Sequence, residues 1–362
     1  MDDRPHGSTA IRAIRSPGVP AAIGAALLFG ASTPFAKALL ANVDPWLLAG
    51  LLYLGSGLGL AIYRWVSRTP RRTQLNPGEW RWFAGAVVTG GIIAPVLLMY
   101  GLTYIAASSA SLLLNAEGVF TALLAWFAFR ENFDLRIALG MVAIVAGAVV
   151  LSWSGELQMA SWWPSLAVLG ACLAWALDNN LTRKVSLAEP TWIACIKGLA
   201  AGITNLMLAY AFTSNVSTPP IATIAAALIV GCMAYGVSLS LFVLSLRHLG
   251  TARTGAYFSI APFFGATLSI VLLHEELTVQ LIIAGALMAV GVWLHLTEHH
   301  SHEHTHDALE HEHEHVHDEH HQHEHEGTQI VSADGKHTHW HRHDALSHEH
   351  THYPDAHHRH DH

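Results

Sequence analysis

Histidine is the residue type in this sequence with the most evident chemistry, because imidazole binds metal ions and titrates near neutral pH. Of the 28 histidines among 362 residues, 24 lie between residues 299 and 362, where they alternate with Glu, Asp and Thr. Imidazoles with flanking carboxylates suit Zn(II), Ni(II), Co(II) or Cu(II), and a flexible chain selects little among them. We predict a metal-binding tail; a pH-responsive polyampholyte and a segment without function are the alternatives. The two densest patches are His337, His339, His341 and His343, and His357, His358, His360 and His362.

The tail also contains the zinc-protease pattern H-E-x-x-H repeatedly, for example beginning at His302, His311 and His348. That motif works when a helix inside a folded pocket presents both histidines. Residues 297–362 have almost no apolar content from which to build a pocket, so we expect a largely disordered segment. The motif therefore follows from composition, and we expect neither enzyme activity nor a required cofactor.

A second group of candidates consists of ionisable residues inside long apolar stretches, where a charge is costly and is usually functional. Glu117 lies about ten residues from either end of such a stretch. It is the best candidate for proton coupling or for substrate binding, the alternative being a structural carboxylic acid bonded to a neighbouring helix. Asn115, two residues away, falls on another face of the helix, so both side chains cannot point squarely into one cavity.

Three more stretches carry such groups. Lys197 lies about seven residues inside its stretch. It could pair with Glu117 or Asp178, bind an anionic substrate, or extend to the cytoplasmic surface. Asp178 and Asn179 lie near the cytoplasmic end of their stretch and are candidates for an inner gate, or for a merely polar helix end. Lys37 lies near the outer end of the first stretch, where extension to the headgroups is the simpler role and a cation at the cavity mouth is the alternative.

The elements that must position these residues are membrane-spanning helices. With 52% hydrophobic and only 13% charged residues, the chain is not an ordinary soluble enzyme, and it has no clustered basic face for nucleic acid. Because every backbone amide in lipid must be satisfied internally, we predict an all-α polytopic protein in the bilayer with ten helices of about twenty residues. The expected spans are 20–40, 46–66, 81–101, 104–129, 136–153, 163–183, 191–212, 221–246, 251–273 and 279–296.

Basic residues indicate the orientation of the spans. Of the 16 Lys and Arg residues before residue 299, 14 lie in the N-terminal arm (residues 1–19) and in alternate loops, and the intervening loops have none. The positive-inside rule then places both termini, and the histidine tail, in the cytoplasm. We expect a multi-pass protein of the plasma (inner) membrane.

An internal repeat relates the two halves of the helical region. A shift of 144 residues carries Glu131 onto Glu275 and Gly147 onto Gly291 without a gap. The halves, 20–153 and 163–296, each hold five expected spans, so they cross the membrane in opposite senses. Inverted repeats of this kind build transport sites that open alternately to either side.

Three segments of this sequence resemble motifs of EamA-type permeases of the drug/metabolite transporter superfamily. They are the first-span motif running from Phe29 to Lys37, Trp175 to Lys184 in the sixth span, and Thr251 through Pro262 to Glu276. The resemblance covers about residues 20–296. It implies two five-helix repeats around a central cavity, with the fifth and tenth helices peripheral, and says almost nothing of the substrate. Where the second repeat has Pro262, the first has Gly118, so we expect helix bends at both.

We favour a secondary transporter that exports a small organic metabolite or drug-like compound, with the tail as a metal-binding regulator. The alternatives are a divalent metal (Ni, Co or Zn) transporter and a membrane-anchored metal sensor or buffer. A metal path needs ligands at the midplane, whereas His248, His274 and His295 lie at or near helix ends. A mere anchor does not need ten helices. The sequence has no phosphate-binding G-x-x-x-x-G-K-[ST] loop, so transport would be driven by proton coupling or by facilitated exchange and not by ATP. The sequence is also compatible with a homodimer.

Overall fold

The computed structural model describes residues 18–67, 75–129, 135–153, 159–185, 188–212 and 218–296, and four short strands between residues 301 and 351. The chain divides near residue 298 into a helical unit and a unit formed by the tail.

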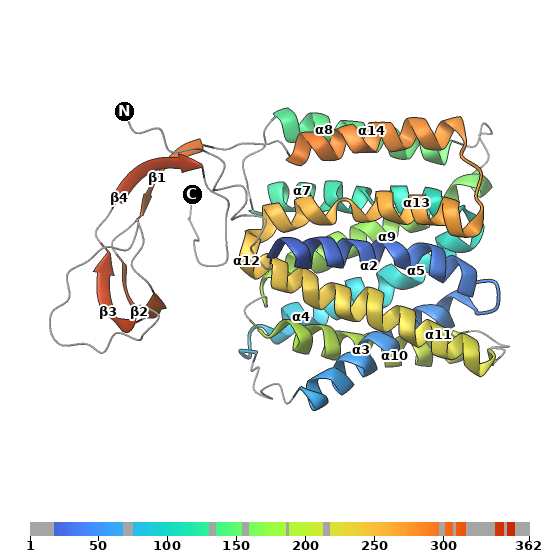
Figure 1. The fold of residues 1–362 in the computed structure, drawn as a ribbon, viewed down its shortest axis with the longest axis horizontal. Helices are drawn as coiled ribbons and strands as arrows, with labels where there is room; N and C mark the ends of the chain where they lie inside the picture. Colours follow the sequence, from blue (N-terminus) through green and yellow to red (C-terminus); the bar gives the residue numbers. More distant parts are fainter. Residues whose placement is uncertain are drawn as a thin grey trace. The chain divides into compact units, whose positions relative to one another are not determined.

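The first half of the helical unit follows the expected spans closely (Figure 1). Asp44 caps α3, because its Oδ1 accepts hydrogen bonds from the backbone N–H groups of Trp46 and Leu47 at 2.9 and 3.3 Å, and Pro45 fits the first turn. The expected span 81–101 is one continuous rod with a π-helical centre, η1. The elements are α2 (Gly18–Leu39), α3 (Pro45–Val66), α4 (Trp80–Ala86), η1 (Val87–Ile93), α5 (Ala94–Tyr104), α6 (Ala107–Leu113), α7 (Ala116–Phe129) and α8 (Leu135–Ser152).

The second half repeats this order of elements. A shift of 144 residues carries α8 onto α14 end to end and places η1 within one residue of η2 at its start. Elements related by this shift also pack in equivalent ways. Helix α3 lies against its counterpart α10, and α8 lies against its counterpart α14. The contact of α2 with α12 is equivalent to that of α9 with α5. The elements are α9 (Met159–Arg183), α10 (Pro190–Phe212), α11 (Ile221–Gly231), η2 (Cys232–Val237), α12 (Ser238–Phe258), α13 (Ala261–Leu273) and α14 (Val279–Leu296).

The expected loop between residues 246 and 251 is wrong. Helix α12 runs through it to Phe258, and the chain breaks instead at Ser259 and Ile260. Pro262 accounts for the position of the break, since proline has no N–H to donate and is tolerated in the first turn of a new helix, here α13. The expected span 104–129 is likewise divided, with its break at Leu114 and Asn115.

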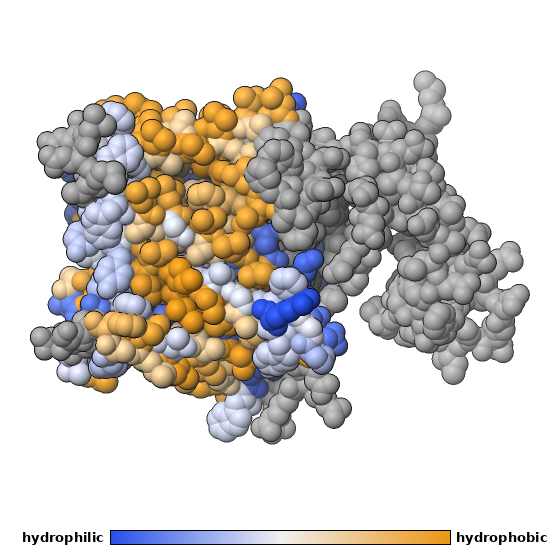
Figure 2. All heavy atoms as spheres, turned by 180° about the vertical axis from the view of Figure 1, so that it is seen from behind, coloured by the Kyte–Doolittle hydropathy of each residue, from blue (hydrophilic) through white to orange (hydrophobic). Residues whose placement is uncertain are grey.

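The surface of the helical unit is that of a membrane protein. Among the described residues, six helical stretches are long and apolar enough to cross a membrane, and three shorter apolar helices accompany them. Large apolar side chains such as Val142 on α8 and Trp293 on α14 are more than half exposed. Figure 2 shows such residues covering the middle of one face, with hydrophilic residues at its two sides. An apolar area of this extent on an isolated chain indicates contact with lipid.

Close packing inside the unit depends on glycines at helix contacts. A Cβ on Gly198 of α10 would lie 2.6 Å from the backbone nitrogen of Gly57 on α3. Similarly, a Cβ on Gly291 of α14 would lie 2.6 Å from the carbonyl oxygen of Gly140 on α8. A backbone atom cannot shift to make room for a Cβ, so these glycines allow the close approach of α3 to α10 and of α8 to α14.

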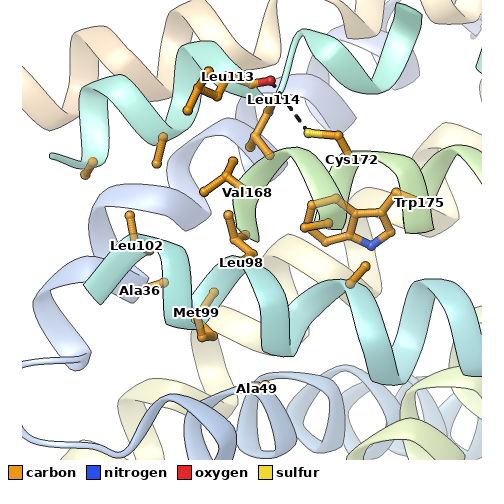
Figure 3. Close-up of a cluster of buried hydrophobic side chains, with 14 of the residues drawn as sticks. Ala36, Ala49, Leu98, Met99, Leu102, Leu113, Leu114, Val168, Cys172 and Trp175 are labelled. Carbon is orange, nitrogen blue, oxygen red and sulfur yellow. Dashed lines mark hydrogen bonds between the residues drawn. The ribbon is translucent and has the colours of Figure 1, made fainter. Parts of the chain in front are cut away.

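Figure 3 shows the part of the apolar core where α5, α6 and α9 meet. Leu98, Leu102 and Val168 are fully buried there. Cys172 is also buried, its thiol donates to the carbonyl oxygen of Leu113 at 3.6 Å, and it forms no disulfide. Cys172 therefore acts as a small buried side chain of the core.

The tail unit contains paired strands where composition predicts a largely disordered segment. Strand β1 (Ser301–His306) pairs antiparallel with β4 (Leu346–Thr351), and β2 (Leu309–His315) pairs antiparallel with β3 (His337–His343). The alternation of His with other residues has the two-residue period of a strand. In the β2–β3 register His311 lies opposite His341 and His313 opposite His339. The second histidine patch, at residues 357–362, lies outside the described residues.

Candidate functional site

A cavity inside the helical unit, the central cavity, brings both halves of the chain together. Its lining comes from α2, α3 and α7 of the first half and from α9, α10, η2 and α12 of the second. Four of the predicted candidates line it: Glu117, Asp178, Asn179 and Lys197.

Lys197 and Asp178 form an ion pair in the lining. The Lys197 ammonium on α10 donates to Asp178 Oδ2 on α9, and the two side chains are only 5% and 8% exposed. Asp178 Oδ1 accepts a further hydrogen bond from the Thr182 hydroxyl at 3.0 Å. Among the partners and roles considered for Lys197, the structure shows the pair with Asp178.

Glu117 has a neutral partner. Its Oε1 accepts a hydrogen bond of 2.7 Å from the Asn179 side-chain amide, which joins α7 of the first half to α9 of the second. Glu117 lies in the first turn of α7, directly after the break at Leu114 and Asn115. The dipole at a helix start favours a carboxylate. The break therefore gives this carboxyl a favourable position facing the cavity.

Aromatic rings form much of the remaining wall. The Phe29 ring centroid lies 5.9 Å from that of Trp175, 6.0 Å from that of Tyr235 and 5.4 Å from that of Phe258. Tyr53 continues the cluster, 5.1 Å from Tyr235. All five residues line the central cavity. The contacts combine edge-to-face and tilted geometries, which are favourable for ring pairs.

The π-helical segment η1 orients two of these rings. The Tyr53 hydroxyl and the Trp175 indole N–H both donate to the carbonyl oxygen of Gly90, at 2.6 and 3.1 Å. Gly90 also lies against the Asp178 carboxylate, so that a Cβ at this position would overlap it. One peptide unit therefore holds two rings and leaves space for the ion pair. Such π-helical turns are frequent at functional sites.

The aromatic wall was missed by the sequence reasoning. The candidates chosen from the sequence are ionisable and amide residues, and no aromatic residue is among them. A usable signal was present, because Phe29, Tyr53, Trp175 and Tyr235 lie well inside their spans rather than at the ends. A buried ring that carries a hydroxyl or N–H needs a polar partner, which marks a polar interior.

Lys37 does not line the cavity. Its ammonium donates to the carbonyl oxygens of Leu102, Thr103 and Ile105, at 2.7, 3.1 and 2.9 Å, where α5 ends. A cation on the free carbonyls of a helix end is favourable. The Lys37 ammonium is thus bound at the junction between α5 and α6.

Glu275 binds the other side of the same junction. Its two carboxylate oxygens accept hydrogen bonds from the backbone N–H groups of Ala107 and Ser108 at 2.7 and 2.8 Å, so it caps α6. His274, with φ 55°, takes the left-handed conformation that ends α13 one residue earlier. Lys37 and Glu275 thus attach one residue from each half to the α5–α6 junction.

The remaining predicted residues lie outside the central cavity. Asn115 is buried and donates to the carbonyl oxygen of Leu112 at 2.9 Å. A Cβ on Gly118 would meet nothing within 4 Å, and the bend lies at Leu114 and Asn115 instead. Pro262 lies in the first turn of α13, after the break. Where side chains are described, no group of three His, Cys, Asp or Glu residues is placed to hold a metal ion.

Comparison with known proteins identifies related sequences over the whole helical unit. The EamA-like transporter family matches this chain twice, over residues 16–153 and 162–297. An uncharacterized transporter of Methanothermobacter thermautotrophicus is 27% identical over 291 residues, which are 75% of this chain and 84% of that protein.

Two relatives have more specific names. The "Probable amino-acid metabolite efflux pump" of Salmonella typhimurium is 26% identical, over 52% of this chain and 67% of its own. The "Probable terminal-alkyne amino-acid exporter" of Streptantibioticus cattleyicolor is 26% identical, over 57% of this chain and 69% of its own. A solved crystal structure with 19% identity has a TM-score of 0.61 and covers 77% of this chain and 96% of that one. At this identity the structural likeness concerns the fold alone.

Proposed function

Because the chain belongs to the EamA-like transporter family, we propose that it exports a small organic metabolite or drug-like compound through the central cavity by alternating access. Its family and its transporter-named relatives make it a transporter and not an enzyme. The observation that carries the proposal is the cavity itself, where Glu117 of the first half meets Asn179 of the second across a polar and aromatic lining.

Alternating access is supported by the repeat. The same shift of 144 residues relates both the sequences and the helices of the halves, down to the π-helical turns. Two such halves of opposite orientation can exchange conformations and so expose the cavity first to one side and then to the other. The alternate-loop distribution of Lys and Arg supports cytoplasmic termini in the plasma membrane.

An organic substrate is favoured over a metal ion by the lining. No histidine or cysteine is among the described residues that line the cavity, and one of its two carboxylates is already paired with Lys197. Soft divalent metals prefer imidazole and thiolate ligands. The two relatives named as amino-acid exporters also support a small organic compound, and outward transport.

Transport by the purified full-length protein in proteoliposomes tests this function. We expect counterflow of at least one labelled compound from a panel of amino acids, amines and aromatic metabolites, and none of Ni(II), Co(II) or Zn(II), because the cavity offers no imidazole. Protein-free liposomes are the control. Accumulation of a metal without any organic compound would instead favour the metal carrier.

The tail is proposed to bind divalent metal and to regulate transport. In the paired strands β2 and β3, the register partners of His311, His313 and His315 are His341, His339 and His337. Imidazole is a ligand that suits Zn(II), Ni(II), Co(II) or Cu(II), and these pairs bring histidines of two separate segments together. A metal that binds there would signal cytoplasmic metal to the carrier.

Deletion of residues 298–362 is expected to leave the transport rate unchanged in metal-free buffer and to abolish its response to micromolar Zn(II) or Ni(II). The reason is that the central cavity lies entirely in the helical unit. Proteoliposome flux across a metal titration measures both effects. The full-length chain with His337, His339, His341 and His343 replaced by alanine is the matched control, and it should lose part of the response. Complete loss of transport on deletion would contradict a regulatory tail.

A further inference from the structure

The charges in the central cavity do not balance. Among its described lining residues are two carboxylates, Glu117 and Asp178, and one ammonium, Lys197. Lys197 and Asp178 neutralise each other at hydrogen-bond distance. Glu117 is bonded to the neutral amide of Asn179. An ionised carboxylate removed from water is costly unless a cation accompanies it, so with Glu117 ionised the cavity favours a positively charged occupant.

The aromatic wall favours the same kind of occupant. Phe29, Trp175, Tyr235 and Phe258 form one cluster in the same lining as Glu117. The face of an aromatic ring attracts cations and packs against flat apolar groups. An organic ammonium ion would thus meet a carboxylate at one part of the cavity and rings at another.

Other charge types fit less well. An anion would have to displace Asp178 from Lys197 and would face the carboxylate of Glu117. A zwitterion such as an amino acid could place its amine at Glu117, but its carboxylate would compete with Asp178 for Lys197, which is held in a buried pair. A neutral compound would leave Glu117 without a cation. The lining therefore discriminates by charge as well as by shape.

We propose that the central cavity binds a small organic compound with a single ammonium group on an aromatic or similarly flat apolar body, with the ammonium at Glu117 and the body against the rings around Phe29. This inference rests on the proposed function, because it names the substrate class of the same cavity. The bound compound is expected to carry a net charge of +1, which ligands of similar shape and different charge can test.

Four probes of nearly the same size differ in charge: phenethylamine, phenylalanine, 3-phenylpropionate and 2-phenylethanol. Isothermal titration calorimetry at pH 7 measures their binding to the purified full-length protein. We expect phenethylamine to bind at least about tenfold more tightly than each of the other three, since a hydrogen-bonded charge pair contributes more than a neutral contact. Equal or tighter binding of phenylalanine or 3-phenylpropionate to the wild-type protein would overturn the inference.

The variant Glu117→Gln locates the effect. It should lower the affinity for phenethylamine about tenfold, to near that for 2-phenylethanol. Glu79→Gln is the matched control, because Glu79 lies outside the cavity and accepts a hydrogen bond from the backbone of Asn76; it should bind phenethylamine as the wild type does. Wild-type affinity in Glu117→Gln would overturn the assignment. If Glu117→Gln does not fold, the wild-type comparison still decides.

The same probes in proteoliposome counterflow separate this inference from the proposed function. Counterflow of phenethylamine above the other three supports both. Transport of amino acids or other organic compounds without binding of phenethylamine overturns the substrate class and leaves the transporter in place. If no organic compound is transported, the proposed function itself is contradicted.

Discussion

Replacing Glu117 by glutamine is expected to reduce the transport rate about 10- to 100-fold while the protein still inserts and folds. Glutamine keeps the size of the side chain and an oxygen that can accept from Asn179, whose amide bonds Glu117 Oε1 at 2.7 Å. The change therefore removes the negative charge and the ability to exchange a proton. A hydrogen bond to a charged group contributes about 1.5–3 kcal/mol, and each 1.4 kcal/mol corresponds to about tenfold in affinity.

Initial rates of counterflow in proteoliposomes measure this effect at subsaturating substrate. Glu79→Gln makes the same chemical change outside the cavity and should transport at the wild-type rate. Size-exclusion chromatography and circular dichroism establish that both variants are folded. A wild-type rate in folded Glu117→Gln would remove Glu117 from the mechanism.

Replacing Lys197 by methionine is expected to lower the free energy of unfolding by about 3 kcal/mol, because it leaves the Asp178 carboxylate buried without a cation. The paired side chains are only 5% and 8% exposed, so solvent compensates little. Denaturant unfolding in detergent micelles, followed by circular dichroism, gives the change in stability.

Two further variants test whether the buried charge of Asp178 causes this loss of stability. The double variant Asp178→Asn with Lys197→Met should recover most of the stability, since no uncompensated charge remains. Arg64→Met breaks the pair with Glu189, whose side chains are more exposed at 12% and 30%, and it should cost about 1 kcal/mol or less. If Lys197→Met were as stable as the wild type, Asp178 would not depend on Lys197.

The helical elements could be predicted largely because hydropathy and turn residues are local signals. Asp44-Pro45 marks the start of α3 correctly, since the cap uses only neighbouring residues. The course of α12 through the expected loop could not be predicted in this way, because a few polar residues in an apolar run look like a loop whether or not the helix continues. The strands of the tail were overlooked because composition was weighed and the two-residue period was not.

The site was predicted in its charges and missed in its rings. Burial of a charge is costly in any fold, so Glu117, Asp178 and Lys197 could be identified from their place in apolar spans. Their pairing could not, since the sequence allowed Lys197 either carboxylate, and only the packing of α9 and of α10 against η1 decides. The carbonyl partners of Lys37 depend on where α5 ends in space. Long-range contacts of this kind leave no local pattern.

The arrangement around Gly90 has a consequence for how this carrier could change its substrate in evolution. The rings of Tyr53 and Trp175 and the carboxylate of Asp178 all depend on one peptide unit. A mutation that moved this unit would disturb rings and charges together, so these three positions can hardly diverge one at a time. Phe242 and Phe258, whose centroids lie 4.8 Å apart in the same lining, have no such tie. New specificities would therefore arise first at those two residues, around an unchanged charged centre.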